Sequence, residues 1–237
     1  MKAMILAAGR GERMRPLTDN CPKPLLTVNG LPLIVHHIKN LVAAGIKDIV
    51  INHAWLGQKI VDYLGCGQQF SANISYSEEP VALETAGGII KALPMLVEHE
   101  NDVFMVINGD IYCDFNLKQL PRLGEEFNAH LLLVNNPEHN PKGDFQLVEG
   151  VLTNPKNNHH ETYTFSGIAL YRKSFFKQDA ATQESTLLQP VQEQQLIQPL
   201  APMLRAGAEQ GKVSASLMTN AWTDVGTPER LAELNTI

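Results

Sequence analysis

The sequence predicts an α/β fold with a Rossmann-like mixed, largely parallel sheet flanked by helices. Short apolar runs alternate with helical patterns through the first half of the chain, which is typical of βαβ units. One of these runs, VFMVIN at residues 103–108, is apolar almost throughout, as expected of a central strand. After about Ala129, strand-like runs follow one another between turn-rich segments, which predicts added antiparallel or mixed strands.

The first half of the chain supplies the parallel part of the expected sheet. Its apolar and helical patterns predict strands at 4–6, 48–52, 73–79 and 103–110, and helices at 33–44, 56–64 and 85–93. In open α/β sheets, ligands bind outside the carboxyl ends of the strands. The polar residues that end the run at 103–110 therefore mark an expected ligand site.

The second half adds strands and two helices. Strand-like runs occur at 129–136, 144–150, 165–172 and 213–219. We expect one helix at about 200–209 and a short one near the end, where Thr227 can cap and Pro228 suits the first turn. The Gln-rich stretch 181–195 is expected to form a surface loop. The sequence contains no internal repeat and no domain-length linker, so we expect a single domain over residues 1–237.

Composition and charge limit the possible classes of function. The chain has 237 residues, 44% of them hydrophobic, which is enough for a full core. A net charge of -6 argues against nucleic-acid binding, which needs a basic surface. No run of about 18 apolar residues and no signal-peptide pattern occurs, so we expect a cytoplasmic protein with no membrane partner. Cys21, Cys66 and Cys113 are far apart and are expected to be free thiols.

The first expected strand runs into LAAGRGERMRPLTDNCPKP, a loop rich in small and basic residues. It lacks the GxxxxGK[ST] pattern of a Walker A loop, and Met14 replaces the third glycine of a dinucleotide-binding loop. Small side chains let a ligand approach the backbone N–H groups, and basic side chains supply charge for phosphates. Lys23 is held between two prolines, which stiffen its backbone. The loop therefore predicts a site for a triphosphate or for a pair of phosphates. The small residues are Ala7, Ala8, Gly9 and Gly11, and the arginines are Arg10, Arg13 and Arg15.

This loop resembles the signature of the sugar-1-phosphate nucleotidyltransferases. LETAGG, INGD and WTDVGT follow it in the order of that family, so the resemblance covers nearly the whole chain. Within the family, IVINHAWLGQKI and TFSGIALY in a chain this short are most similar to the uridylyltransferases that act on N-acetylmuramic acid 1-phosphate. The resemblance implies the nucleotidyltransferase fold and an enzyme that joins UTP and this sugar phosphate. The products would be a UDP-sugar and pyrophosphate, formed in peptidoglycan recycling for the cell wall.

Other functions stay open at this point. Within the family, the substrates can be mannose-1-phosphate with GTP, or glucose-1-phosphate with dTTP or UTP. A different class is a non-catalytic regulatory subunit that binds a nucleotide sugar and keeps the fold. The joint presence of Lys23, Asp110 and Asp224 argues against such a sensor, which has no need for both metal carboxylates. The oligomeric state is left open.

The resemblance implies catalytic roles for Lys23, Arg13 and Asp110. Arg13 would contact the triphosphate and Lys23 the phosphates at the reacting centre, while Asp110 and Asp224 would bind the cofactor Mg²⁺. An attacking phosphate is already ionised near neutral pH, so no general base is required. The residues implied for nucleotide binding are Leu6, Ala7, Ala8, Gly9, Gly11, Arg13, Glu78, Gly87 and Gly88, with Glu79 as an alternative to Glu78 for reading the base.

The resemblance also divides the expected domain into two halves. Residues 1–128 would mainly bind the nucleotide and residues 129–237 mainly the sugar. The residues implied for the sugar pocket are Asn108, Gly143, Asp144 and Glu161. The histidine pairs His36–His37 and His159–His160 are expected to be structural or on the surface, and Trp55 is expected in the core.

Overall fold

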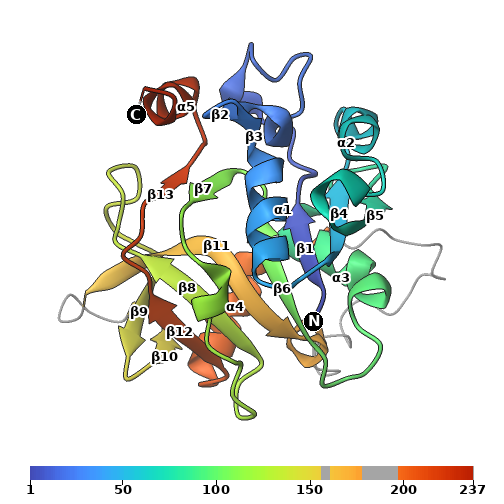
Figure 1. Cartoon of the computed structure of the whole chain (residues 1–237). Helices are drawn as coiled ribbons and strands as arrows, with labels where there is room; N and C mark the ends of the chain where they lie inside the picture. The colour runs from blue at the N-terminus through green and yellow to red at the C-terminus, as the bar shows by residue number, and fades with distance from the viewer. Residues whose placement is uncertain (156–160, 178–196, 237) are drawn as a thin grey trace, which may run out of the picture.

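A large mixed sheet flanked by helices organises the protein in the computed structural model, which describes residues 1–155, 161–177 and 197–236 (Figure 1). The Gln-rich stretch 181–195 and the pair His159–His160 lie outside the described residues. The predicted α/β class, with a mixed sheet flanked by helices, is confirmed.

The first half of the chain folds as alternating strands and helices. Its elements are β1 (Ala3–Leu6), α1 (Leu33–Ala43), β4 (Asp48–His53), α2 (Gly57–Leu64), β5 (Asn73–Glu78), α3 (Glu84–Leu96) and β6 (Val103–Asn108). Neighbouring strands in the order β5-β4-β1-β6 are parallel. Leu6 is level with both Asn52 and Asn108 across the ladders, so the carboxyl ends of three strands meet at one edge.

The second half extends the sheet with strands of mixed direction. Its elements are β8 (Ala129–Val134), β9 (Phe145–Val148), β10 (Val151–Thr153), β11 (Thr162–Arg172), α4 (Leu200–Glu209) and β12 (Val213–Leu217). The long strand β11 runs antiparallel to both β6 and β8 and joins the halves. Among the described residues, the sheet has nine strands in the order β5-β4-β1-β6-β11-β8-β12-β10-β9.

Side chains that alternate along the strands form two apolar layers, one on each face of the sheet. On β1, Ile5 belongs to the layer that packs against α1 and α2, where Ile38 and Ile60 are fully buried. The adjacent Met4 belongs to the opposite layer, which contains Ile89 of α3 and Leu204 of α4. In the described part of the chain, helices therefore cover both faces of the sheet, and the strand ends stay available for a ligand.

The C-terminal segment returns to the N-terminal part of the chain. β13 (Trp222–Asp224) pairs with β7 (Ile111–Cys113), and α5 (Pro228–Leu234) lies near the small hairpin of β2 (Thr27–Val28) and β3 (Leu31–Pro32) (Figure 1). A third apolar cluster holds these parts together through Met14, Val28, Leu33, Val225 and Leu231.

Two local predictions hold in this structure. The Thr227 hydroxyl accepts a hydrogen bond from the Arg230 N–H at 3.4 Å and Pro228 opens α5, so the predicted cap is confirmed. All three cysteines are free thiols, as expected. Within the described ranges, no helix combines the length and apolar character needed to cross a membrane.

Candidate active site

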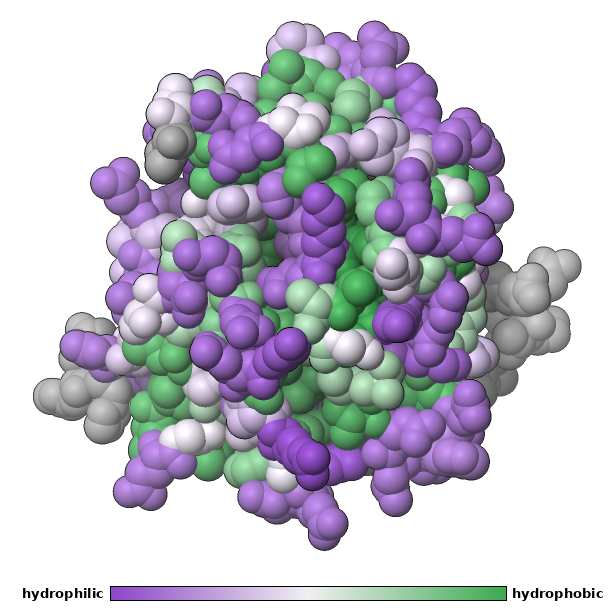
Figure 2. Space-filling view, in the orientation of Figure 1, coloured by the Kyte–Doolittle hydropathy of each residue, from purple (hydrophilic) through white to green (hydrophobic). Residues whose placement is uncertain are grey.

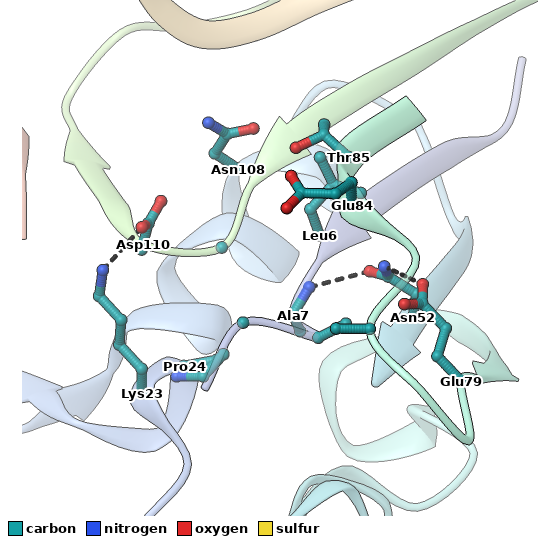
Figure 3. A pocket seen from close by; sticks show the side chains of 14 residues that line it. Leu6, Ala7, Lys23, Pro24, Asn52, Glu79, Glu84, Thr85, Asn108 and Asp110 are labelled. Carbon is teal, nitrogen blue, oxygen red and sulfur yellow. Dashed lines mark hydrogen bonds and ion pairs between the residues drawn. The ribbon is translucent and has the colours of Figure 1, made fainter. Parts of the chain in front are cut away.

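A cavity of about 290 Å³ lies at the carboxyl ends of the parallel strands. The face of the molecule in Figure 2 is hollowed near its centre, where hydrophilic and hydrophobic side chains meet. The cavity is closed on one side by the loop after β1 and on another by the start of α3 (Figure 3). Its lining consists of Leu6, Ala7, Ala8, Gly9, Lys23, Pro24, Asn52, Glu79, Ala82, Glu84, Thr85, Asn108, Gly109 and Asp110.

The N-terminal loop is shaped by a glycine and a threonine. Gly11 adopts a φ of 68°, and its carbonyl accepts hydrogen bonds from the Thr18 hydroxyl at 2.8 Å and the Met14 N–H at 2.9 Å. A Cβ added at Gly11 would lie 3.0 Å from a Thr18 methyl group, so the turn is tight. The loop then doubles back and carries Lys23 to the cavity, while Arg13 stays exposed on a 3-10 helix outside the lining.

Lys23 and Asp110 form an ion pair inside the cavity. Lys23 Nζ donates to Asp110 Oδ2 at 2.6 Å, and the Lys23 side chain is only 9% exposed (Figure 3). Residues far apart in the sequence are thus brought together, one from the loop and one from the end of β6. A buried ammonium beside a half-exposed carboxylate gives this end of the cavity both a cation for phosphates and an anion for a metal.

A buried hydrogen-bonded chain lines the opposite end of the cavity. Asn52 Oδ1 accepts from the Ala7 N–H at 2.9 Å, and Asn52 Nδ2 donates to Glu79 Oε1 at 2.7 Å. Glu79 Oε2 also accepts from the Leu83 N–H at 3.1 Å. Asn52 and Glu79 are 2% and 3% exposed, so the network is rigid and water is largely kept from it.

Glycines of α3 support this network from behind rather than lining the cavity. A Cβ added at Gly88 would lie 2.6 Å from Glu79 Oε1 and 2.9 Å from Asn52 Nδ2. Gly87 is buried, and its N–H donates to the Gln198 carbonyl at 3.1 Å. Glu78 is exposed and lies outside the lining, whereas its neighbour Glu79 is part of it.

Asp224 is brought beside Asp110 by the pairing of β13 with β7. Asp224 is level with Ile111 across that ladder, and the Val225 N–H donates to the Asp110 carbonyl at 2.9 Å. The Asp224 carboxylate accepts from Arg230 at 2.9 Å and lies 3.5 Å from His139 Nε2. The described residues contain no group of three or more His, Cys, Asp or Glu side chains placed to hold a metal. Two carboxylates on adjacent backbones fit Mg²⁺, which usually takes one or two carboxylates and completes its shell with substrate phosphates.

A buried histidine lies behind Asp110. Burial lowers the pKa of His37 to about 4, and the nearby Asp110 carboxylate opposes that shift to a smaller degree. His36 Nε2 lies 2.8 Å from the Val28 carbonyl. His37 is buried and His36 contacts the backbone, so a structural role fits both residues, as expected for this pair.

The residues expected for the sugar pocket divide into two groups. Asn108 lines the cavity, whereas Gly143, Asp144 and Glu161 do not. The Asp144 carboxylate accepts from the Phe165 N–H at 2.9 Å and from Asn140 Nδ2 at 3.1 Å. Exposed Glu161 accepts from the Tyr163 hydroxyl at 2.8 Å.

Trp55 does not belong to the core, so that expectation is wrong. Its side chain is 38% exposed, and the Arg10 guanidinium lies 4.7 Å from the centroid of its ring. Trp55 follows the end of β4, close to the N-terminal loop, where its Nε1 donates to the Thr18 carbonyl at 3.4 Å. Residue type alone predicts a buried tryptophan at this position, but in the fold its ring lies against the charged Arg10 side chain.

Comparisons with known proteins all find nucleotidyltransferases. The model of the nucleotidyl transferase family matches residues 2–237. An N-acetylmuramate alpha-1-phosphate uridylyltransferase of Neisseria meningitidis serogroup B is 48% identical over 238 residues, covering 98% of this chain and 96% of that protein. A mannose-1-phosphate guanyltransferase of Yarrowia lipolytica is 35% identical, over 56% of this chain and 37% of that protein.

Solved structures agree on the fold. A protein of Bacillus anthracis, assigned as a glucose-1-phosphate thymidylyltransferase and crystallised with sucrose, superposes with a TM-score of 0.80 at 26% identity. That match covers 100% of this chain and 94% of the other. HddC of Yersinia pseudotuberculosis, complexed with GMP-PN, has a TM-score of 0.71 at 18% identity over 99% of this chain and 98% of its own.

Proposed function

The chain belongs to the nucleotidyl transferase family, and we propose that it transfers the uridylyl group of UTP to N-acetylmuramic acid 1-phosphate. The 48% identity to the Neisseria uridylyltransferase over nearly the full length of both chains is the observation that carries this proposal. The Yarrowia guanyltransferase matches only 56% of this chain, so GTP with mannose-1-phosphate is the second candidate pair. A UDP-sugar of this kind places the enzyme in peptidoglycan recycling, and the use of UTP favours the cytoplasm.

The reaction forms one bond and breaks one. A phosphate oxygen of the sugar-1-phosphate attacks the α-phosphorus of UTP, and the bond from that phosphorus to the bridging oxygen of the β-phosphate breaks. Pyrophosphate leaves with the bonding electron pair, and the attacking phosphate needs no base because it is already ionised. The protein must hold two anions in line and neutralise the charge that develops between them.

We assign the charged end of the cavity to the phosphates. Lys23, buried and 2.6 Å from Asp110, would contact phosphate oxygens at the reacting centre. Arg13 is exposed beyond the lining, so we assign it to the outer phosphates of the triphosphate. The opposite end, with Asn52 and Glu79, is assigned to the base.

The nucleotide would rest on the backbone of the N-terminal loop. Ala8 has a small side chain and Gly9 has none, so both leave room at the cavity wall, while the Ala7 N–H donates to Asn52 Oδ1. Gly11 shapes this loop, and Gly88 lets α3 pack closely behind Glu79, while Gly87 is buried beside it in the helix. These positions belong to residues 1–128, the proposed nucleotide half.

Asp110 and Asp224 would hold Mg²⁺ together with oxygens of the substrates. When bound, the ion supplies neutralisation of the phosphate charges. Asp110 also pairs with Lys23, and Asp224 pairs with Arg230, so each carboxylate has a cationic partner from the chain itself.

The sugar is assigned mainly to residues 129–237, with Asn108 at the border. Asp144 fixes the β8–β9 connection to β11 through Asn140 and the Phe165 N–H, so we assign it and Gly143 to shaping the sugar pocket. Glu161 belongs to the same half of the chain and is exposed, so we assign it to contact with the sugar.

Pyrophosphate release across a matrix of nucleoside triphosphates and sugar-1-phosphates tests the proposal. We expect release with UTP and N-acetylmuramic acid 1-phosphate in the presence of Mg²⁺, at a kcat/KM well above that of GTP with mannose-1-phosphate or dTTP with glucose-1-phosphate. A different preferred pair of substrates would correct the proposed substrates but leave the assignment as a nucleotidyltransferase unchanged. No release with any pair would identify a non-catalytic nucleotide-sugar-binding subunit.

A further inference from the structure

Glu84 has an unusual backbone for a residue with a side chain. It is the first residue of α3 and has a φ of 61°, in the left-handed region that glycine adopts most readily. The preceding Leu83 is fixed by its hydrogen bond to buried Glu79, so the chain is held on entry to the helix. A glycine would fit this backbone with less strain, and the glutamate side chain therefore needs a reason.

The side chain of Glu84 lies in the wall of the cavity. Figure 3 shows it beside Thr85, on the same side of the cavity as Asn108. Within residues 1–155, 161–177 and 197–236, no hydrogen bond or ion pair to its carboxylate is formed, in contrast to the carboxylates of Glu79 and Asp110. An exposed carboxylate held in a cavity is a ready acceptor for a donor on a ligand.

The position of Glu84 along the cavity indicates which donor this is. Asn52 and Glu79 lie at one end, Lys23 and Asp110 lie at the other, and Glu84 and Asn108 lie between them (Figure 3). A nucleotide has its ribose between base and phosphates. A carboxylate repels phosphate groups and accepts strong hydrogen bonds from neutral hydroxyls.

We propose that the Glu84 carboxylate accepts a hydrogen bond from a ribose hydroxyl and selects ribonucleoside over deoxyribonucleoside triphosphates. This inference rests on the proposed function, because it assumes a nucleotide oriented with its phosphates at Lys23. It makes Glu84 a specificity-determining residue of the nucleotide half.

The test compares kcat/KM for UTP, 2′-deoxy-UTP and 3′-deoxy-UTP at a fixed, saturating concentration of N-acetylmuramic acid 1-phosphate. We expect the wild type to prefer UTP over at least one deoxy analogue by roughly 10- to 100-fold, the range of a hydrogen bond to a charged group. In Glu84→Gly the ratio should fall toward 1 because UTP loses its advantage. In Glu84→Gln the ratio should be intermediate, since the amide oxygen still accepts.

The chain offers a matched control in Glu149. It is also an exposed glutamate with a positive φ, 50°, but it lies in the turn between β9 and β10, outside the cavity lining. Glu149→Gly removes the same charge and relieves the same kind of backbone strain. We expect it to match Glu84→Gly in melting temperature while its ratio of UTP to deoxy-UTP stays at the wild-type value.

Two outcomes would overturn the assignment of Glu84. One is a wild-type ratio for both deoxy analogues in Glu84→Gly. The other is an unchanged nucleotide ratio with altered preference among sugar-1-phosphates, which would put the carboxylate on the second substrate. Calorimetric dissociation constants for UTP and its deoxy analogues repeat the comparison without turnover. Failure of the proposed function, no release of pyrophosphate by the wild type, is therefore distinguishable from failure of this inference.

Discussion

The ion pair of Lys23 and Asp110 joins the two kinds of charge that phosphoryl chemistry needs. The ammonium group is nearly buried, and the carboxylate is 39% exposed toward the cavity. Since water competes less with a buried donor, Lys23 can contact a phosphate more strongly than a surface lysine can. The pair also keeps each group in place before substrates arrive.

Lys23→Ala should remove most of the activity and leave the fold intact. We expect kcat to fall by about 100-fold or more, because a positive charge is lost where the transition state gathers negative charge. Pyrophosphate release gives the rate and circular dichroism the fold. Lys173→Ala is the matched control, since Lys173 pairs with Glu100 at 2.8 Å on the surface. Turnover of Lys23→Ala close to that of Lys173→Ala would remove Lys23 from the catalytic machinery.

At the scale of residues, the sequence identified the motif residues better than their spatial partners. Lys23, Asn108 and Asp110 stand in recognisable motifs, and all three line the cavity. Asn52 was not among the predicted site residues, although it links the N-terminal loop to Glu79. Polar residues at the ends of the runs DIVINH and NISYSEE were a usable signal, because strand ends in such sheets meet at one edge. The sequence does not decide which of Glu78 and Glu79 points into the cavity, because this depends on the pleat of β5 and on where the strand ends.

Two glycines of the cavity should respond differently to alanine. A Cβ at Gly109 would lie 2.5 Å from the Leu6 carbonyl oxygen, which already accepts from the Gly109 N–H at 2.9 Å. Gly109→Ala should therefore push the ends of β1 and β6 apart and lower the free energy of unfolding by about 1–3 kcal/mol. Nothing lies within 4 Å of a Cβ at Gly9. Gly9→Ala should keep wild-type stability but raise KM for UTP, because the methyl group takes space meant for the nucleotide.

Urea unfolding and steady-state kinetics of these two variants check the contrast. An unchanged stability of Gly109→Ala would mean that the β1–β6 contact relaxes freely, and an unchanged KM in Gly9→Ala would move the nucleotide away from the loop.

We expect His130 to make the pairing of β8 with β12 sensitive to acid. Its ring nitrogens lie 2.9 Å from the Ser214 hydroxyl and 3.0 Å from the Ser216 hydroxyl, and burial lowers the pKa of His130 to about 4. The unfolded pKa is about 6.5, so between pH 7 and pH 5 the unfolded chain binds a proton that the folded chain does not. His130 therefore contributes stability above pH 6.5, and that contribution is lost as the pH falls toward 4.

The expected loss from His130 between pH 7 and pH 5 is about 1–2 kcal/mol of unfolding free energy. Denaturant unfolding at both pH values measures it in the wild type and in His130→Asn, which cannot titrate in this range. The variant should lose less stability than the wild type over that interval. Identical losses in the two proteins would show that His130 has an ordinary pKa in the folded state.

At the scale of elements, the helical and strand patterns were reliable where the periodicity was long. The expected helix at about 200–209 matches α4, Leu200–Glu209, and the expected helix at 33–44 matches α1 within one residue. α3 is longer than the expected 85–93 because Pro94 lies inside it without ending it. The order of the strands could not be predicted from the sequence. It depends on contacts between distant parts of the chain, such as those that insert β11 between β6 and β8.

At the scale of the whole molecule, the C-terminal segment packs against the N-terminal part of the chain and brings Asp224 next to Asp110. Asn235 Oδ1 accepts from the Asn29 N–H at 2.9 Å, and Asn235 Nδ2 donates to the Thr27 carbonyl at 3.0 Å. These bonds and the third apolar cluster hold α5 against the N-terminal part of the chain. Asp224 thereby reaches the backbone next to Asp110. The sequence implied that the two carboxylates share a metal only through resemblance, because 113 residues separate them and no local pattern connects them.

Removing divalent metal should stop turnover without loosening the fold. Within the described chain no group of three or more candidate ligands exists, so substrate phosphates and water would complete a metal site at Asp110 and Asp224. A metal that binds mainly with the nucleotide adds little stability to the free protein. We therefore expect EDTA to abolish pyrophosphate release, Mg²⁺ to restore it, and the melting temperature of the protein without nucleotide to stay unchanged. Asp224→Asn should weaken Mg²⁺-dependent UTP binding in calorimetry, whereas Asp62→Asn, which alters an exposed carboxylate bonded to Gln58, should not. A clear drop in melting temperature with EDTA alone would instead reveal a structural metal, and the carboxylates would then hold an ion before any substrate binds.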